Sequence, residues 1–402
     1  MNLERERTAV APKVAQQKIA FVITGLSTGG AEMMLYKFLT RIDRERYAPV
    51  VISMMDGGVF VERFEALDIP VKTLGLKPAQ YNFGAVFKLA KILREIQPDL
   101  IQGWMYHANL FAQWAKYLAK SKAPVFWSIH HSVDSLRAER LVVIAVIKVS
   151  SWFSGRAEKV VFSATKGQNQ HTKLGFAANN ALAIGDNFDL TKYKPVSNSG
   201  FNLRSALNLP EDAILVGSVA RYHPMKDHAT LLDAAAILIE QNPLVHFVLI
   251  GPDVVAENPA LAEQIERLGI SDRVHLLGER QDVPDLMTSF DVFTTSSARG
   301  ESFPNVLGEA MSCQVPCVAT DIGDSRIIVG DTGVVVEPKD PQALANAWHQ
   351  LVKLDRTERQ ELGKQARQRI EANFNLDGAN SFVRKYEAMY EAFLAQNCSC
   401  SN

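Results

Sequence analysis

Cysteine is scarce in this sequence, and long apolar runs are missing. The four cysteines among 402 residues are too few for a secreted disulfide framework, and no histidine pair gives them the spacing of a metal site. The longest apolar run, residues 141–147, is far too short to cross a bilayer, and the charged residues 1–10 contain no apolar signal core. We therefore expect a cytoplasmic protein without a bound metal, and we expect residues 1–16 to be disordered.

An excess of one charge is also absent, because 43 Lys and Arg stand against 44 Asp and Glu. The two halves differ, however: residues 1–200 hold 26 basic and 16 acidic side chains, which leaves 17 and 28 for the remainder. A basic surface attracts phosphates or an anionic membrane face. The asymmetry has two open interpretations, namely two domains with different partners or an uneven surface composition.

Short apolar strands alternate with helix-like stretches from about residue 18 onward. KIAFVIT and DLIQGW predict buried strands, and FGAVFKLAKILREIQ predicts a helix between them. The pattern restarts near residue 213 with AILVGSVA, after a linker-like stretch at 186–202 that is rich in Asn, Asp, Ser, Gly and Pro. This alternation predicts an α/β protein with two domains, at 17–190 and 200–375, each built on a parallel sheet covered on both faces.

Two loops that follow predicted strands carry groups suited to phosphate. In TGLSTGGAE, Gly29 and Gly30 let the backbone approach a ligand closely at a helix N-terminus. In RYHPMKD, Arg221 and Lys226 can neutralise a diphosphate without a metal. Either loop alone is also compatible with a tight turn or with solvated charges. Both stand at the carboxyl ends of strands, where parallel sheets bind ligands.

The stretch GESFPNVLGEAM places two carboxylates, Glu301 and Glu309, eight positions apart. If Pro304 is the first helical residue, Glu301 lies in the loop above the helix and Glu309 lies inside it. A helix N-terminus attracts anions, so carboxylates at this position need hydroxyl or other donors as partners. Phe303 and Asn305 lie between the two acids, and we assign them to nucleotide contact.

Histidines follow two further predicted strands. His107, in WMYHANL, stands where it either donates a hydrogen bond to a substrate oxygen or begins a helix as a capping residue. His130 and His131, in WSIHHSVD, leave the same choice open.

The stretch at residues 136–153 is strongly apolar and contains three basic residues. Its apolar side chains run almost all round a helix, which favours a helix buried against the sheet. The alternative is a membrane-surface helix with Trp152 and Phe153 at the interface.

Taken together, these motifs resemble the retaining GT-B glycosyltransferases of family 4. GGAE, RYHPMKD and GESFPNVLGEAM, the last followed by VPCVATDIGD, occur in the family's order, and the acid pair matches its E-x7-E motif. The resemblance implies two Rossmann-like domains with a cleft between them, with a helix at 376–397 returning to the N-terminal domain. It also implies metal-independent transfer of a sugar from a nucleotide diphosphate, UDP by family frequency, to a hydroxyl acceptor that is lipid-linked or part of a surface polysaccharide.

The resemblance assigns roles to the residues of the C-terminal domain. Glu301 would hold the hydroxyls of the donor sugar, and Glu309 would bind the ribose hydroxyls. Arg221 and Lys226 would neutralise the diphosphate, while the loop at 278–282 would frame the base. No cofactor other than the donor substrate is implied.

In the N-terminal domain, the resemblance implies that a backbone N–H near Gly30 reaches the phosphates and that His107 touches the donor sugar. Two positions depart from the family pattern: Ser302 and Asn187 stand where glycine is usual. Expected partners are the nucleotide sugar, the acceptor and an anionic membrane surface, with no nucleic acid. An epimerase acting on nucleotide sugars and a non-catalytic nucleotide-sugar binding protein are the alternatives.

Overall fold

The computed structural model describes residues 16–27, 29–77, 83–133, 136, 140–195 and 202–399. The predicted disorder of residues 1–16 therefore falls almost entirely outside the described residues. Contacts divide the chain into two compact units, one formed by residues 1–128 with 152–160 and the other by 129–151 with 161–402.

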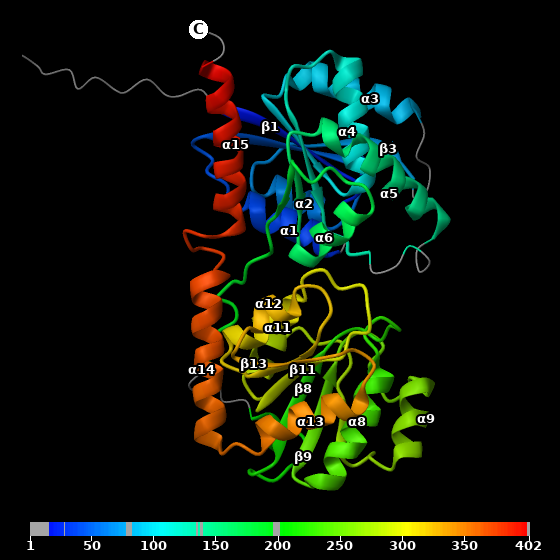
Figure 1. The fold of residues 1–402 in the computed structure, drawn as a ribbon, viewed down its shortest axis with the longest axis vertical. Helices are drawn as coiled ribbons and strands as arrows, with labels where there is room; N and C mark the ends of the chain where they lie inside the picture. The colour runs from blue at the N-terminus through cyan, green and yellow to red at the C-terminus, as the bar shows by residue number, and fades with distance from the viewer. Residues whose placement is uncertain are drawn as a thin grey trace, which may run out of the picture. The chain divides into compact units, whose positions relative to one another are not determined.

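A seven-stranded sheet is formed by the first half of the chain, in the order β3-β2-β1-β4-β5-β6-β7 (Figure 1). Every residue of β4 and β5 is buried, as expected for strands covered on both faces. The three-residue strand β7 was not predicted, because so short a run carries no periodicity. The strands are β1 (Gln17–Ile23), β2 (Tyr47–Met55), β3 (Val71–Leu76), β4 (Leu100–Trp104), β5 (Val125–Ile129), β6 (Val160–Phe162) and β7 (Ala181–Ala183).

Helices connect most of these strands, as the alternating pattern predicts. The indole N–H of Trp104, at the end of β4, donates to the carbonyl of Ala31 at 2.9 Å and so ties the central strand to α1. The helices of this part are α1 (Gly30–Leu39), α2 (Phe60–Glu65), α3 (Phe83–Ile96), α4 (Tyr106–Ala119), α5 (Leu141–Phe153) and α6 (Thr165–Lys173), with a 3-10 turn at Ser154–Arg156.

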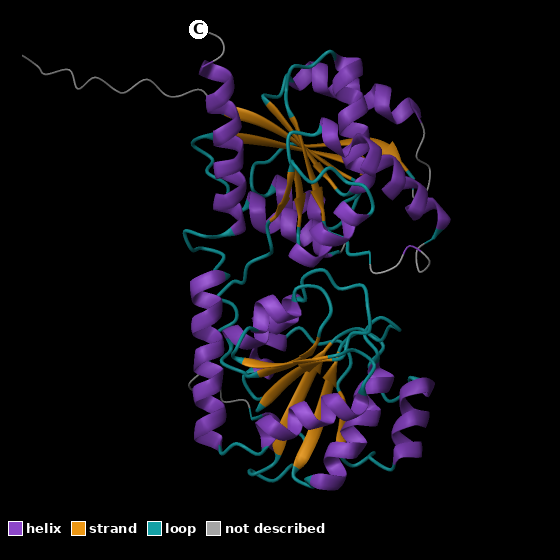
Figure 2. Cartoon of the chain, viewed as in Figure 1, coloured by secondary structure: helices purple, strands orange, loops and turns teal. Residues whose placement is uncertain are grey.

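A second sheet of six strands has the order β10-β9-β8-β11-β12-β13, and all of its strand pairs are parallel (Figure 2). This confirms the prediction of two parallel Rossmann-like sheets. The strands are β8 (Ile214–Val219), β9 (Val245–Ile250), β10 (Val274–Leu276), β11 (Val292–Thr295), β12 (Cys317–Thr320) and β13 (Gly333–Val336). The helices are α7 (Leu203–Ala206), α8 (His228–Gln241), α9 (Pro259–Leu268), α10 (Val283–Met287), α11 (Asn305–Ser312), α12 (Ser325–Val329), α13 (Pro341–Val352), α14 (Arg356–Asn373) and α15 (Phe382–Ser399).

Separate apolar clusters cover the two faces of the second sheet. On one face, the fully buried Trp348 of α13 lies 4.9 Å from the ring of Phe247, and its N–H donates to Thr294 Oγ1 at 3.0 Å. On the other face, α11 and α14 pack with Phe188 and Phe303. Burying one such aromatic side chain contributes about 3 kcal/mol to the packing of these helices on the sheet.

Three local expectations need correction. The helix predicted from Pro304 begins at Asn305, with Pro304 as its N-cap. Asn187 stands where the family usually has glycine, and asparagine there would tolerate a left-handed backbone. It does not take a positive φ, however, and its side-chain oxygen accepts the N–H of Phe382 at the start of α15. Of the stretch expected to be buried, residues 136–153, the segment Leu141–Phe153 forms α5, whose only buried residues are Ile147 and Ser150, and residues 137–139 lie outside the described part of the chain.

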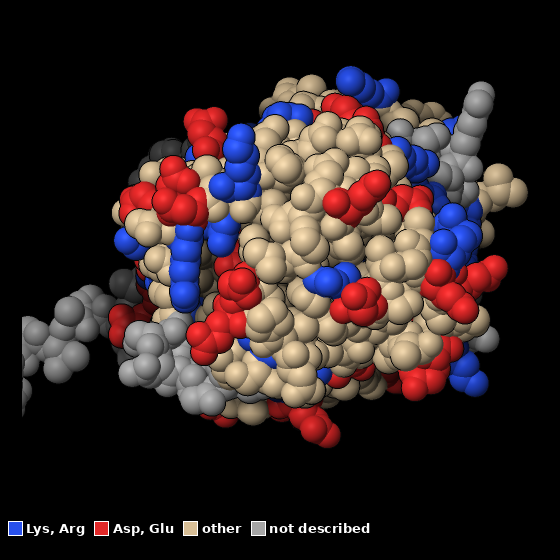
Figure 3. Space-filling model, turned by 90° about the horizontal axis from the view of Figure 1, so that it is seen from below, with Lys and Arg blue, Asp and Glu red and all other residues tan. Residues whose placement is uncertain are grey.

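The surface charge of the second half and the length of the apolar helices bear on possible partners. On the face seen in Figure 3, basic and acidic side chains are interspersed, so the acidic excess of the second half forms no single-sign patch there. Among the described helices, none is both long enough and apolar enough to cross a membrane.

Candidate active site

Strand order in the second sheet reverses between β8 and β11, so the helices that follow these two strands, α8 and α11, pack on opposite faces of the sheet. Open parallel sheets bind ligands at such a switch point. Lys226 lies on the loop after β8 and Glu301 on the loop after β11, and Lys226 Nζ forms an ion pair with Glu301 Oε1. The two side chains are only 24% and 18% exposed, so the switch point holds a largely buried charge pair.

Hydrogen bonds join the two loops at this point. The hydroxyl of Ser296 donates to the carbonyl of Lys226 at 2.8 Å, and the N–H of Ala298 donates to the carbonyl of Met225 at 2.8 Å. The hydroxyl of Ser297 donates to Glu301 Oε1 at 3.1 Å. The carboxylate of Glu301 is therefore held by two donors on a braced loop.

Two glycines allow the backbone to close around Glu301. Gly300 has φ +78°, and a Cβ there would collide with the side chain of Met225. Gly323, in the loop after β12, has φ +58°, and a Cβ there would collide with the carbonyl of Ser302. Both positions need the left-handed conformation that glycine tolerates, and at Gly323 the backbone of the neighbouring loop also leaves no room for a side chain. Three loops thus converge on Glu301.

The N-terminus of α11 faces this loop cluster without a side-chain cap. Pro304 is its N-cap and offers no hydrogen-bonding side chain. The N–H of Leu307 donates to the carbonyl of Pro304 at 3.1 Å, which leaves the N–H groups of Asn305 and Val306 for an anion. Asn305, the first helical residue, has a buried Oδ1 without a hydrogen-bond partner in the described part of the chain. A buried orphan acceptor beside free N–H groups indicates a polar ligand or water at this position.

Glu309 lies on α11, one turn after Asn305, and has a different partner from Glu301. The hydroxyl of Tyr193 donates a hydrogen bond to its carboxylate, and burial together with this carboxylate raises the pKa of Tyr193. Tyr193 was not predicted from the sequence. It lies in the linker-like stretch, where turn-forming residues conceal its contact with α11.

The turn that carries Tyr193 is itself fixed. Asp189 Oδ1 accepts from the N–H and the hydroxyl of Thr191, at 3.0 and 2.6 Å. Arg367 of α14 donates to the carbonyls of both Tyr193 and Ser312, which ties the turn to the C-terminal end of α11. Tyr193 is therefore a fixed partner of Glu309.

The remaining predicted residues of this half lie in different surroundings. Arg221 is exposed on the loop after β8, with no ion pair among the described residues. Phe303 is buried, with its ring stacked on Phe188 at 5.9 Å, so its side chain supports the loop from the core. His228, not predicted, begins α8 beside Lys226; burial first, and then that cation, lower its pKa to about 4. It is therefore neutral at pH 7.

The first sheet has the same kind of switch point, between β1 and β4. Ile23 pairs with Trp104, so the loops after these strands leave the sheet at one level. Gly29 is the N-cap of α1 without a side-chain hydrogen bond, and a Cβ on Gly30 would meet nothing within 4 Å. The backbone is open at Gly30, whereas a Cβ on Gly29 would collide with the carboxylate of Glu32. The contact of this loop with a ligand stays a prediction.

His107 is the second residue of α4, directly above β4. Burial lowers its pKa, so the imidazole is neutral at pH 7. Met105, the N-cap of α4, has φ +79°, which is strained for a residue with a side chain. Such strain is often found at functional sites. The structure thus places Gly30 and His107 at one switch point, and Lys226 and Glu301 at the other.

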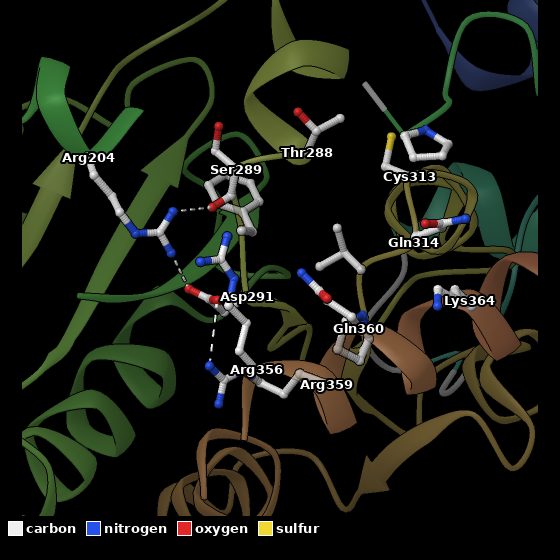
Figure 4. Close-up of a pocket in the computed structure, with 14 residues that line it drawn as sticks. Arg204, Thr288, Ser289, Asp291, Cys313, Gln314, Arg356, Arg359, Gln360 and Lys364 are labelled. Carbon is white, nitrogen blue, oxygen red and sulfur yellow. Dashed lines mark hydrogen bonds and ion pairs between the residues drawn. The ribbon is translucent and has the colours of Figure 1, made fainter. Parts of the chain in front are cut away.

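A further cavity, of about 360 Å³, opens at the opposite end of the second sheet, where Asp291 precedes β11 and Pro316 precedes β12 (Figure 4). Its main polar contact is structural: Asp291 accepts from Arg204 and from the N–H of Leu215, and Arg359 lies 3.8 Å away. Because parallel sheets bind substrates at the carboxyl ends of strands, we do not assign this cavity to the active site. Among the described residues, no cluster of His, Cys, Asp and Glu could hold a metal ion.

Comparison with protein families assigns both halves of the chain. Residues 28–183 match the family described as Glycosyltransferase Family 4, and residues 201–369 match the family described as Glycosyl transferases group 1.

Curated relatives and solved structures agree with this assignment. A D-inositol 3-phosphate glycosyltransferase of Corynebacterium urealyticum is 38% identical over 42% of this chain and 42% of its own length. The UDP-Gal:alpha-D-GlcNAc-diphosphoundecaprenol alpha-1,3-galactosyltransferase of Escherichia coli is 29% identical over 41% of this chain and 43% of its own length. The matches thus span less than half the length of these two relatives.

Among solved structures, Anabaena HepE (Alr3699) in complex with UDP superposes with a TM-score of 0.81 at 26% identity, covering 94% of this chain and all of that chain. The same protein in complex with UDP-glucose gives a TM-score of 0.76 at 25% identity, covering 93% of this chain and all of that chain. The fold, the family models and these neighbours agree that the chain belongs to the GT-B glycosyltransferases of family 4.

Proposed function

We propose that this protein transfers a hexosyl or N-acetylhexosaminyl group from a UDP-sugar to a hydroxyl acceptor, with retention at the anomeric carbon. The observation that carries the proposal is the Lys226–Glu301 pair at the switch point of the second sheet, beside the uncapped N-terminus of α11. A cation, a carboxylate and free N–H groups converge there, which is the chemistry that a sugar diphosphate requires. The similar HepE structures, which hold UDP and UDP-glucose, support the choice of UDP as the nucleotide.

In this proposal, the diphosphate lies on the first turn of α11. Lys226 carries three N–H donors, so it can keep Glu301 with one and offer others to a phosphate oxygen. Arg221, exposed on the same loop, adds the second cation. The side-chain oxygen of Asn305 can accept from a donor hydroxyl. These residues supply the neutralising charge, so we propose that transfer requires no metal and no cofactor besides the donor.

The two acids hold different ends of the donor. Glu301, braced by Ser297 and Lys226, accepts from the sugar hydroxyls. Glu309 accepts from the ribose hydroxyls while Tyr193 occupies one of its lone-pair positions. The side chain of Phe303 makes no direct contact in this proposal and fixes the loop from the core.

Transfer breaks the bond between the anomeric carbon and the diphosphate oxygen. The bonding electrons leave with the diphosphate, and Lys226, Arg221 and the helix N-terminus stabilise the growing negative charge. The acceptor oxygen forms the new bond on the same face of the sugar, and its proton passes to a leaving phosphate oxygen. We also propose that the backbone N–H of Gly30 contacts the phosphates and that neutral His107 donates to a sugar hydroxyl.

The acceptor that we propose is a lipid-linked sugar or a cell-surface polysaccharide, handled at the cytoplasmic face of a membrane. The basic excess of residues 1–200 supports an anionic acceptor or anionic surroundings. The E. coli relative, by its name, acts on a diphosphoundecaprenol-linked sugar.

A panel of nucleotide sugars tests the proposal. We expect calorimetry to show UDP binding, and we expect slow release of free sugar from one UDP-sugar without acceptor, unaffected by EDTA. Lys226→Ala should lower the rate of release about 10²-fold or more, while Lys353→Ala, which changes an exposed lysine at the end of α13, should leave it unchanged. Binding without any turnover on the whole panel would indicate a binding protein, and an epimerised nucleotide sugar would indicate an epimerase.

A further inference from the structure

Large apolar side chains project from three helices of the first half of the chain. Phe83 and Phe87 of α3 are 77% and 61% exposed, Tyr117 of α4 is 54% exposed, and Trp152 of α5 is 84% exposed. Single exposed apolar residues are ordinary on a protein surface, but a contiguous group of them marks an interaction site. We refer to these four residues as the aromatic face.

The aromatic face is contiguous because Trp114 of α4 links its helices. The ring of Trp114 stacks on Phe83 at 6.2 Å and meets the edge of Phe153, the neighbour of Trp152, at 5.9 Å. Phe87 lies one turn from Phe83 on α3. These ring contacts therefore join α3, α4 and the C-terminal end of α5 within one compact unit.

The helix α5 adds an apolar stripe that no part of the described chain covers. Leu141, Ala145, Lys148 and Trp152 follow helical spacing along one side, and all four are exposed. Leu141 is 84% exposed, as much as Trp152. Exposure of this apolar stripe to water is unfavourable, and covering it with an apolar surface would stabilise the protein.

Positive charge surrounds the apolar side chains. The helices α3, α4 and α5 together contain five basic side chains and a single acidic one, Glu95. Lys91 and Arg94 follow Phe83 and Phe87 along the exposed side of α3, and Lys148 lies within the stripe of α5. Long basic side chains beside protruding aromatic rings suit the boundary between anionic headgroups and acyl chains.

We propose that the aromatic face is a docking surface for an anionic lipid bilayer. Its charge is complementary to anionic headgroups, and its rings and the stripe of α5 enter the interface. This inference rests on the proposed function in one respect: a lipid-linked acceptor would be met at the same membrane. The docking itself depends only on the surface.

Vesicle co-sedimentation of the full chain tests the proposal. We expect binding to phosphatidylcholine vesicles that contain phosphatidylglycerol, much weaker binding to phosphatidylcholine alone, and weakening by salt. The triple variant Phe83→Ser, Phe87→Ser and Trp152→Ser should lower the partition coefficient at least about tenfold, because each ring buries apolar area in the interface. Leu244→Ser, which changes an exposed apolar residue before β9, is the matched control and should bind as the parent does.

Three outcomes separate this proposal from its rivals. Equal binding of parent and triple variant to anionic vesicles, or no binding by the parent, overturns it. A parent dimer that the triple variant abolishes, without vesicle binding, assigns the face to a second copy of the chain. UDP affinity is measured on every variant, so a failure of the proposed glycosyl transfer is recognised separately from a failure of membrane docking. If the triple variant does not fold, the charge variant Lys91→Glu with Arg94→Glu provides the second test. It should likewise reduce binding to anionic vesicles.

Discussion

Replacing Lys226 with alanine separates the catalytic and the structural contribution of the charge pair at the switch point. The expectation from the sequence, a solvated lysine on an exposed loop, predicts a loss of turnover with unchanged stability. The structure predicts both losses, because Lys226 is 24% exposed and forms an ion pair with a carboxylate that is 18% exposed.

The magnitudes follow from this partial burial. Breaking a fully buried pair costs about 3–5 kcal/mol, and an exposed pair contributes about 0–1 kcal/mol. For Lys226→Ala we expect an intermediate loss of about 1–2 kcal/mol, since Glu301 keeps the Ser297 hydroxyl as a partner. Loss of one preorganised charge at a developing phosphate anion should lower turnover by about 10²-fold or more.

Arg221→Ala is the matched variant, because Arg221 is exposed and has no ion pair among the described residues. It should lose turnover by a similar factor and keep its free energy of unfolding. Urea unfolding and turnover of the best UDP-sugar are measured on both variants. Equal stability of the two variants would refute the argument from burial, and near-parent turnover of both would show that the diphosphate lies elsewhere.

Three further predictions use the surroundings of the site. Folding lowers the pKa of His228 from 6.5 to about 4, so the folded protein loses up to about 3 kcal/mol of stability as the pH falls through this range. In urea unfolding, His228→Gln should reduce this dependence of stability on pH, and an unchanged dependence would exclude His228 as its source. Tyr193→Phe removes the donor to Glu309 and should weaken UDP binding about three- to tenfold by calorimetry, whereas unchanged affinity would show that Tyr193 has no part in positioning it. Gly300→Ala should lower turnover and stability together, and adding Met225→Ala should restore them only in part, because the positive φ persists; full restoration would mean that the collision alone matters.

The fold and the pairing of loops could be predicted from the sequence because they depend on patterns. Continuous apolar strands alternating with helices require two parallel sheets, and the switch points then fix which loops meet. Lys226 and Glu301, 75 positions apart, come together for that reason. Residues directly after predicted strands could therefore be placed in the fold, because the end of a strand in the sequence is also an edge of the sheet.

Packing across elements could not be predicted, since it depends on geometry that no spacing encodes. Tyr193 reaches Glu309 from a turn that Arg367 ties to the end of α11. Phe303 lies between Glu301 and Glu309 in the sequence, where a ligand contact is expected, but its ring stacks on Phe188 in the core. The helix α5 reads as buried from its apolar periodicity, yet its outer side is uncovered in the described chain.

Titration of UDP into Glu301→Gln and Glu309→Gln tests the central claim that the two acids divide the donor between sugar and nucleotide. UDP carries a ribose and no transferable sugar, so Glu309→Gln should weaken its binding while Glu301→Gln leaves it nearly unchanged. Turnover of the full UDP-sugar should fall in both variants, and more steeply in Glu301→Gln. An equal loss of UDP affinity in the two variants, measured by calorimetry, would contradict the assignment of Glu301 to the sugar.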